Sequence, residues 1–453
     1  MAASTGAING TEKGAEIKAQ YKKFIGRKIL FIFFSLIAIF VVAGVSTSLG
    51  SANIPVSDTY SAIFHKFAPD YFNPRPFETN HLFNLTEEFE EDLNNGVISD
   101  KFKEEFERKK GFSPSTIVKE ENDKWMVMDE KREKVYFVKK EETLKVYMAM
   151  MPETIITIVW DLRLSRTIMG ILAGMGLAIA GTMMQGILRN PLASPFTLGI
   201  ASSAGFGAVV AICLGAGIVG GKYLIIGNAF LFALIPTFVI LGLTRYKRAT
   251  PETMILAGIA LMYIFSALTH LINYFAESEA VKEAYFWMVG SLGRVTWAEL
   301  VFHLNTGHGT VPLPGPVPVV LICCVIPLIW KSWDVNVMGA GDETAKSLGV
   351  SVERTRVFVF VMASLLTAGI VCFTGTIGFV GLVAPHICRI IIGGDNRFLI
   401  PASGLFGGAF LLACDIVART IMAPVILPVG VVTALTGGPF LFSLLTGRRR
   451  EYW

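Results

Sequence analysis

Long apolar stretches alternate with short polar islands along most of this chain. The first stretch covers residues 29–50, and each stretch holds roughly 20 residues, enough for one α-helix to cross the hydrocarbon core of a bilayer. The pattern therefore predicts an all-α polytopic membrane protein with about ten transmembrane helices. The later nine are expected at 164–186, 196–216, 222–243, 253–275, 312–331, 356–376, 379–393, 399–419 and 428–446.

The distribution of charge predicts the orientation. Basic residues from Lys22 to Lys28 precede the first helix, and such residues favour the cytoplasmic side. With ten crossings both termini are cytoplasmic, and four basic islands fall on the same side: 245–248, 346–356, 395–397 and 448–450. Only 17% of the 453 residues are charged, and the net charge is +4. The partner that this composition indicates is the lipid bilayer, not a nucleic acid.

The polar segments divide the chain into parts. We expect a cytoplasmic tail at 1–28, the first helix at 29–50, an external soluble insertion at 51–152, a membrane core with helices two to ten at 153–447, and a cytoplasmic tail at 448–453. The core contains a cytoplasmic loop at 334–356. Residues between 275 and 312 that fall outside the spans, such as Glu283 and His303, are expected in external loops.

The insertion is mildly acidic, with 15 Lys and Arg against 20 Asp and Glu. Thr86 begins one predicted helix and Ser99 a second one. Residues 124–128 and 134–138 flank a charged turn, which is typical of a β-hairpin. We expect a small external α+β fold.

Cysteine and histidine positions restrict the chemistry. All six cysteines lie in or beside apolar stretches and none lies in the insertion, which excludes a disulfide-stapled external domain. No spacing matches a zinc or haem-attachment pattern, and no catalytic constellation is present. We therefore predict no metal site and no catalytic site on this chain.

The loop at 334–356 is polar and rich in glycine. Asp342 can cap a short helix over 343–348, which Gly349 would end. A short capped helix between two spans could dock into another protein, or it could simply connect the spans.

Two segments predict broken membrane helices. Asn190 and Pro191 disfavour continuation of the second helix. Farther on, Gly378, Gly381 and Pro385 would bend a helix that also carries His386 and Arg389. Ionisable residues inside a membrane are candidates for function, although a kinked helix whose polar groups satisfy one another is an equal alternative.

Arg163 and Arg166 lie at the outer end of the second helix, three residues apart and so on one face. The pair could bind carboxylates of another protein, or it could snorkel to the membrane interface.

Three segments resemble the permease subunits of ABC importers for iron–siderophore complexes, haem and cobalamin. They are 163–208, 340–350 and 374–397. The second resembles the family pattern LGDETARSLGV, with Ala340 where Leu is common. The third resembles GxIGFVGLVAPHIxRxxxGxDHR, with Asn396 where His is usual. The resemblance extends over roughly 160–446.

The resemblance implies a permease that translocates a metal chelate by ATP-driven alternating access. An iron(III)–siderophore would be the first candidate substrate, then cobalamin, then haem. The chain would not be an enzyme and would bind no cofactor, because ATP would be hydrolysed on separate ATPase subunits. Further partners would be a second permease copy and an extracytoplasmic substrate-binding protein, at a cell membrane.

The resemblance also implies roles for single residues. Coupling to the ATPase falls to Gly341, Asp342, Glu343, Ala345, Leu348, Gly349 and Val350. Docking of the binding protein falls to Arg163, Arg166 and Arg419. Structural or gating roles fall to Asn190, Pro191, Gly378, Gly381, Pro385, His386 and Arg389. The fifth span would line the pathway, with Met262, Ser266 and Asn273 as candidates. An ion-gradient-driven secondary transporter and a membrane-bound sensor that uses the insertion stay open as alternatives.

Overall fold

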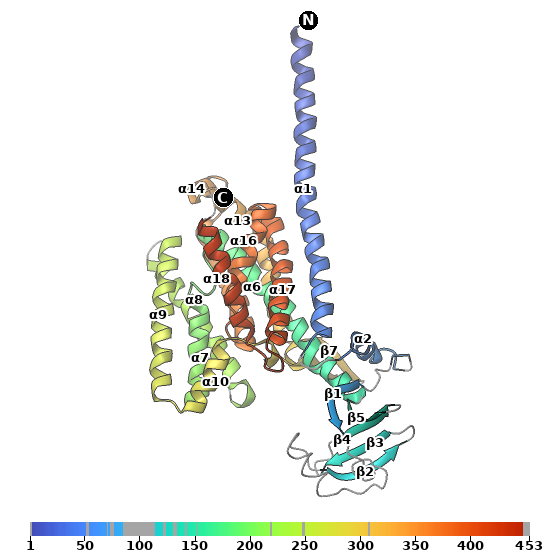
Figure 1. Ribbon diagram of the computed structural model, residues 1–453. Helices are drawn as coiled ribbons and strands as arrows, with labels where there is room; N and C mark the ends of the chain where they lie inside the picture. The colour runs from blue at the N-terminus through green and yellow to red at the C-terminus, as the bar shows by residue number, and fades with distance from the viewer. Residues whose placement is uncertain are drawn as a thin grey trace. The chain divides into compact units, whose positions relative to one another are not determined.

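The computed structural model describes residues 2–50, 54–69, 71–72, 77–84, 114–120, 124–129, 134–140, 143–150, 152–217, 220–246, 250–306 and 309–446 (Figure 1). The chain forms two compact units. One consists of Met1–Ser46 together with Ser165–Trp453, and the other of Thr47–Leu164. The first is called the membrane unit below, and the second the insertion unit.

The membrane unit consists mainly of apolar helices. Its longer elements are α1 (Ala2–Ser48), α6 (Ser165–Leu188), α7 (Ile200–Leu214), α8 (Leu224–Tyr246), α9 (Pro251–Phe275), α10 (Ser278–Met288), α12 (Pro316–Trp330), α15 (Val352–Thr374), α16 (Val380–Ile392), α17 (Asn396–Thr420) and α18 (Val429–Thr446). Its short elements are η2 (Gly221–Tyr223), η3 (Leu292–Arg294), α11 (Trp297–Leu300), α13 (Ser332–Gly339), α14 (Asp342–Ser347) and the antiparallel strands β6 (Val301–Thr306) and β7 (Gly309–Pro314).

The all-α polytopic fold is confirmed. Within the described residues, 6 helices are long and apolar enough to cross a membrane, and α12 with α13 forms a further candidate span bent by 49°. Three shorter apolar helices are α7, α16 and α18. Together these segments occupy the positions of the predicted spans.

Two regions differ from the sequence-based expectation. Helix α1 begins at Ala2 and so extends the first span back through the predicted tail, although the tail contains the poor helix formers Gly6, Gly10 and Gly14. The region between α9 and α12, expected as external loops, contains α10, η3, α11 and the β6–β7 hairpin. Helix α10 is too short and too charged for a search based on membrane spans, but it buries Ala284 and Trp287.

Helix α6 is the centre of the membrane unit, and glycines let its neighbours approach closely. A Cβ added at Gly174 would overlap the Gly407 carbonyl oxygen of α17. One added at Gly181 would overlap the Gly381 carbonyl oxygen of α16. Backbones that touch in this way are typical of membrane helices, because lipid provides no hydrophobic drive for their association.

The predicted breaks are present. Helix α6 ends at Leu188, and Arg189 adopts a φ of 48° before Asn190 and Pro191. The break between α15 and α16 ends at Phe379, which has a φ of 66°. Positive φ is uncommon for residues other than glycine, so packing around both breaks must hold these conformations.

The insertion unit has a five-stranded antiparallel sheet in the order β1-β5-β4-β3-β2. Its elements are α2 (Val56–His65), β1 (Phe77–Asn84), β2 (Pro114–Glu120), β3 (Lys124–Asp129), β4 (Lys134–Lys140), β5 (Thr143–Met150), α5 (Pro152–Thr157) and the π-helix η1 (Ile158–Leu164). The predicted hairpin is confirmed as β3 and β4, with Lys124 opposite Val138 and Met128 opposite Lys134. The helices predicted from Thr86 and Ser99 lie outside the described residues.

Candidate functional site

The short helix α14 lies at one end of the membrane unit, and α10 lies at the opposite end (Figure 1). Glycines flank α14 on both sides, and both have positive φ, 109° at Gly341 and 84° at Gly349. Ala345 is fully buried, whereas Glu343 and Gly349 are exposed and Leu348 keeps 67% of its surface exposed. Val350 is half-buried. One side of the helix therefore faces the unit, while the carboxylate of Glu343 and the C-cap residue Leu348 are exposed, a shape suited to docking.

Asp342 does not cap α14, so that expectation is wrong. The N-cap is Gly341, and Asp342 is the first residue of the helix. Its carboxylate turns inward, because Arg356 Nη2 donates to both of its oxygens at 2.9 Å. Arg189 Nη2 lies 3.4 Å from the same carboxylate. Arg356 also donates from Nε to the Ile187 carbonyl oxygen at 3.2 Å.

Arg166 and Arg419 meet on one buried carboxylate. Asp415 has no exposed surface, and it accepts from Arg166 Nη2 at 2.7 Å and from Arg419 Nε at 2.9 Å. Arg419 Nη2 also donates to the Ser46 hydroxyl at 2.9 Å. This triad of Arg166, Asp415 and Arg419 joins α6, α17 and α1.

Arg163 belongs to the insertion unit, not to the triad. It is buried in η1, and its Nη1 donates to the carbonyl oxygens of Thr47 at 3.1 Å and Ser48 at 2.8 Å. The spacing of three residues therefore does not make Arg163 and Arg166 one fork. All three arginines predicted for docking are at most 8% exposed and bonded internally.

The broken helix α16 is tied to α6 through polar groups. His386 is buried and its ring lies 6.2 Å from that of Phe440. Arg389 is buried and donates from Nη2 to Gln185 Oε1 at 3.3 Å. Pro385 is buried within the same helix. The bond between Arg389 and Gln185 agrees with the structural alternative, but that alternative is met only in part, because the buried Gln185 Nε2 has no hydrogen-bond partner among the described residues.

The remaining predicted residues at the breaks have local roles. Asn190 Oδ1 accepts from the Leu192 amide at 2.9 Å, which closes the turn that contains Pro191. Gly381 provides the contact with α6 described above. A Cβ on Gly378 would meet only the ring of Phe196 at 3.7 Å, so no close approach requires glycine there.

A cavity of about 300 Å³ opens beside α9. Two of the three predicted pathway residues, Met262 and Ser266, line it, and His270 follows them at helical spacing. Asn273 lies elsewhere, with its Oδ1 3.9 Å from Cys213 Sγ. The other lining residues are Phe196, Thr197, Ala201, Ser202, Gly205, Thr269, Met288 and Thr376. The wall is mainly apolar with scattered hydroxyls, which suits a large ligand that slides past.

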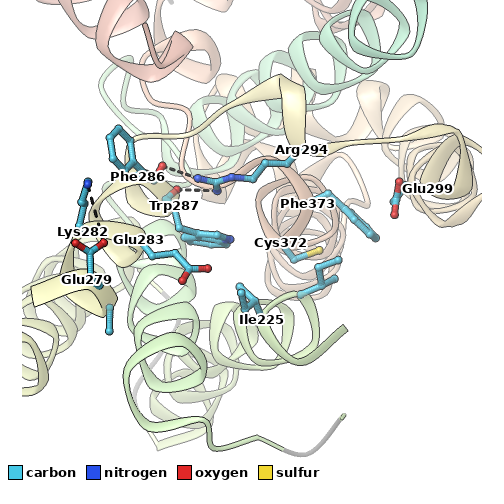
Figure 2. A pocket seen from close by; sticks show the side chains of 12 residues that line it. Ile225, Glu279, Lys282, Glu283, Phe286, Trp287, Arg294, Glu299, Cys372 and Phe373 are labelled. Carbon is cyan, nitrogen blue, oxygen red and sulfur yellow. Dashed lines mark hydrogen bonds and ion pairs between the residues drawn. The ribbon is translucent and has the colours of Figure 1, made fainter. Parts of the chain in front are cut away.

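A second cavity of about 630 Å³ lies beside α10 (Figure 2). Arg294 donates into the C-terminal end of α10, to the carbonyl oxygens of Phe286 at 2.6 Å and Trp287 at 3.3 Å. Burial lowers the pKa of Arg294, although the nearby Glu283 opposes that shift. Arg294 therefore fixes α10 against the short segment after it.

A cluster around Asp395 ties α1, α13 and α17 together near α14. Arg397 Nη2 donates to this carboxylate at 2.7 Å and Asn336 Nδ2 at 2.8 Å, while Lys28 Nζ lies 3.5 Å away. Burial alone would raise the pKa of Asp395, but hydrogen bonds from Arg397 and Asn336, with the charge of Lys28, lower it to about 2.

Sequence reasoning missed Arg356 and the cluster around Asp395. The available signal was charge at the start of a span, where a long side chain can turn inward as well as outward. Nothing in the spacing distinguishes the two directions.

Comparison with known proteins identifies the family of this chain. The model of the FecCD transport family matches residues 135–447. A candidate ABC transporter permease protein of Methanocaldococcus jannaschii is 47% identical, over 65% of this chain and 83% of its own length. The cobalamin import system permease protein of Halobacterium salinarum is 38% identical, over 66% of this chain and 75% of its own length.

A solved structure agrees with these relatives. It is described as an inward-facing conformation of a candidate metal-chelate type ABC transporter. It superposes with a TM-score of 0.56 at 29% identity, and covers 64% of this chain and 88% of its own. The resemblance drawn from the sequence motifs is thereby confirmed.

Proposed function

Because this chain belongs to the FecCD transport family, we propose that it is the membrane permease of an importer that carries a metal chelate into the cell. We expect an iron(III)–siderophore as the substrate. Cobalamin follows because a relative at 38% identity is a cobalamin permease, and haem is third. The chain itself catalyses no covalent step, and ATP is hydrolysed on separate subunits.

The observation that carries this proposal is the shape of α14. This helix of 6 residues lies between α13 and α15, at one end of the membrane unit. Glu343 is exposed on the helix, and Leu348, the C-cap residue that follows it, is also exposed. An exposed leucine beside a carboxylate is suited to a groove on another protein. We assign that groove to the ATPase, one subunit for each of two permease copies.

The cavity beside α9 supplies half of a pathway in this scheme. Met262 and Ser266 line it together with apolar residues from other helices. In a pair of permeases, two such walls would face each other and enclose a wider channel. An apolar wall with few polar groups lets a bulky chelate pass without binding it tightly, which transport requires.

Docking of an external binding protein through Arg166 and Arg419 is also part of the proposal. Both guanidinium groups already bond to Asp415. A carboxylate on the binding protein would therefore have to displace Asp415, and this requires breaking the buried ion pairs of Asp415 with the two arginines. Arg163 would act separately, from the insertion unit.

Purification from the native membrane tests the proposal. The tagged chain is solubilised in detergent, and the eluate is assayed for ATP hydrolysis and for a co-purifying ATPase subunit. Leu348→Asp should abolish co-purification, whereas Leu214→Gln, at another exposed leucine remote from α14, should not. Well-folded wild-type protein that brings down no ATPase would refute the ABC assignment and favour a gradient-driven transporter.

The substrate is tested separately. The purified complex is reconstituted into proteoliposomes together with its binding protein, and ATP-dependent uptake is measured for an iron(III)–hydroxamate chelate, cobalamin and haem. Uptake of none of them, by a complex that hydrolyses ATP, would refute the metal-chelate proposal while leaving the permease assignment intact.

A further inference from the structure

We propose that Arg356 is a positioning residue that locks the docking helix α14 to the end of α6, so that a displacement of α14 is passed directly into the membrane unit. The inference rests on the proposed function, because it takes α14 as the site at which the ATPase acts. It differs from the role that the family resemblance implies for Asp342, whose side chain here bonds within the chain.

The geometry forms a three-way junction. Arg356 is the fifth residue of α15, and its Nη2 donates to both carboxylate oxygens of Asp342 at 2.9 Å. Its Nε bonds to the carbonyl oxygen of Ile187, in the last turn of α6, at 3.2 Å. One planar guanidinium therefore holds the first residue of α14 and the C-terminal end of α6 in a fixed relation.

Burial makes this junction stiff. Arg356 is 2% exposed, and a buried guanidinium requires its partners, because an unpaired charge away from water is costly. Arg189, which follows α6, adds a second cation 3.4 Å from the same carboxylate. Movement of Asp342 must therefore move the end of α6, break the half-buried pair with Arg356, or break the buried bond from Arg356 to Ile187.

A second ion pair between α14 and α15 provides a matched control. Lys346 Nζ lies 3.2 Å from Glu353 Oε1, and the two side chains are 42% and 56% exposed. Exposed pairs contribute little, since water and salt screen them. It joins the same two helices as the Arg356 pair, and within the part of the chain that the structure describes the ion pairs of Lys346 are to Glu343 and Glu353, on α14 and α15.

The test compares Arg356→Gln with Glu353→Gln in the reconstituted complex. For Arg356→Gln we expect ATPase co-purification and basal hydrolysis within about twofold of wild type, and a fall in substrate taken up per ATP of about tenfold, within the range usual for coupling between sites. Glu353→Gln should match wild type in all three. Unchanged uptake per ATP in Arg356→Gln, or an equal loss in Glu353→Gln, would overturn the proposal.

A distance measurement separates positioning from a general loss of structure. Spin labels at Ser347→Cys on α14 and Leu192→Cys after α6 measure the distance between α14 and the end of α6. The labelled chain also carries Cys323→Ser. Arg356→Gln should broaden the distance distribution, and Glu353→Gln should not. An unchanged distance distribution in Arg356→Gln would refute the proposed positioning role of Arg356.

Asp342→Asn is the second variant, used if Arg356→Gln does not give a monodisperse protein. It keeps the shape of the side chain and removes the charge, so it should show the same fall in uptake per ATP and the same broadening. Absence of both effects would overturn the proposal. Failure of the proposed function is recognised separately, as a wild-type chain that co-purifies with no ATPase.

Discussion

Replacement of Asp415 by asparagine should be among the most destabilising single substitutions in the membrane unit. The carboxylate is fully buried and accepts from Arg166 Nε and Nη2 at 2.9 and 2.7 Å and from Arg419 Nε at 2.9 Å. Asparagine removes the negative charge that two buried guanidinium groups face. It also replaces one accepting oxygen with an NH₂ group that opposes another donor.

The size of the effect follows from that arrangement. Removing one partner of a buried ion pair typically costs about 3–5 kcal/mol, because the other charge is left uncompensated. Here one substitution affects two cations, so we expect at least about 3 kcal/mol. The exposed pair between Lys346 and Glu353 sets the lower reference, since breaking it with Glu353→Gln should cost about 1 kcal/mol or less.

The assay is unfolding of the purified protein in mixed micelles of rising SDS content, followed by helical circular dichroism. A second arm replaces the whole triad with apolar residues, Arg166→Met, Asp415→Leu and Arg419→Met, which should recover most of the lost stability because no buried charge remains. A loss for Asp415→Asn no larger than for Glu353→Gln, or a triple variant weaker than Asp415→Asn, would refute the reasoning.

Three further predictions concern packing, pH and the cavity beside α9. Gly181→Ala should lower the free energy of unfolding by about 3 kcal/mol in the same assay, because its Cβ would overlap the Gly381 carbonyl. Gly205→Ala should cost far less, because its Cβ would make only ordinary contacts with the Met288 side chain, at 3.6 and 3.7 Å. Wild type should lose stability as pH falls from about 4 to about 2, because the folded-state pKa of Asp395 is depressed to about 2. Asp395→Asn should make this dependence shallower by the share of Asp395, and an identical pH profile would contradict it. Ser266→Trp should abolish uptake by proteoliposomes while ATPase co-purification persists, and normal uptake would show that the cavity is not on the pathway.

The positions of the membrane helices could be predicted because hydropathy alone determines them. A run of roughly 20 apolar residues has few alternatives to a spanning helix, since lipid leaves backbone groups no other partners. The same criterion could not find α10 or the β6–β7 hairpin, whose residues are polar or amphipathic and too few to span. Their stability comes from packing on neighbours, which periodicity does not report.

The candidate residues could be named from the sequence, but not their partners. Arg166 and Asp415 are separated by 249 positions, so no local rule joins them. For Asp342, by contrast, a local rule existed but gave the wrong prediction. A local rule was available, since aspartate favours the N-cap, but a buried arginine 14 positions later offered the carboxylate a stronger, charge-assisted partner. Tertiary contact overrode local preference.

The bonds around α6 explain why these ionic contacts lie where they do. Arg166, in its first turn, bonds to Asp415, and Ile187, in its last turn, accepts from Arg356. The helix has 24 residues, so at a rise of about 1.5 Å per residue these contacts lie near opposite ends of a rod of about 36 Å. Between them, Gly174 and Gly181 bring α17 and α16 into backbone contact. These contacts hold both ends of α6 and bring two neighbouring backbones against its middle. Under the proposal for Arg356, we therefore expect a displacement applied at α14 to move α6 as a unit and to reach the triad.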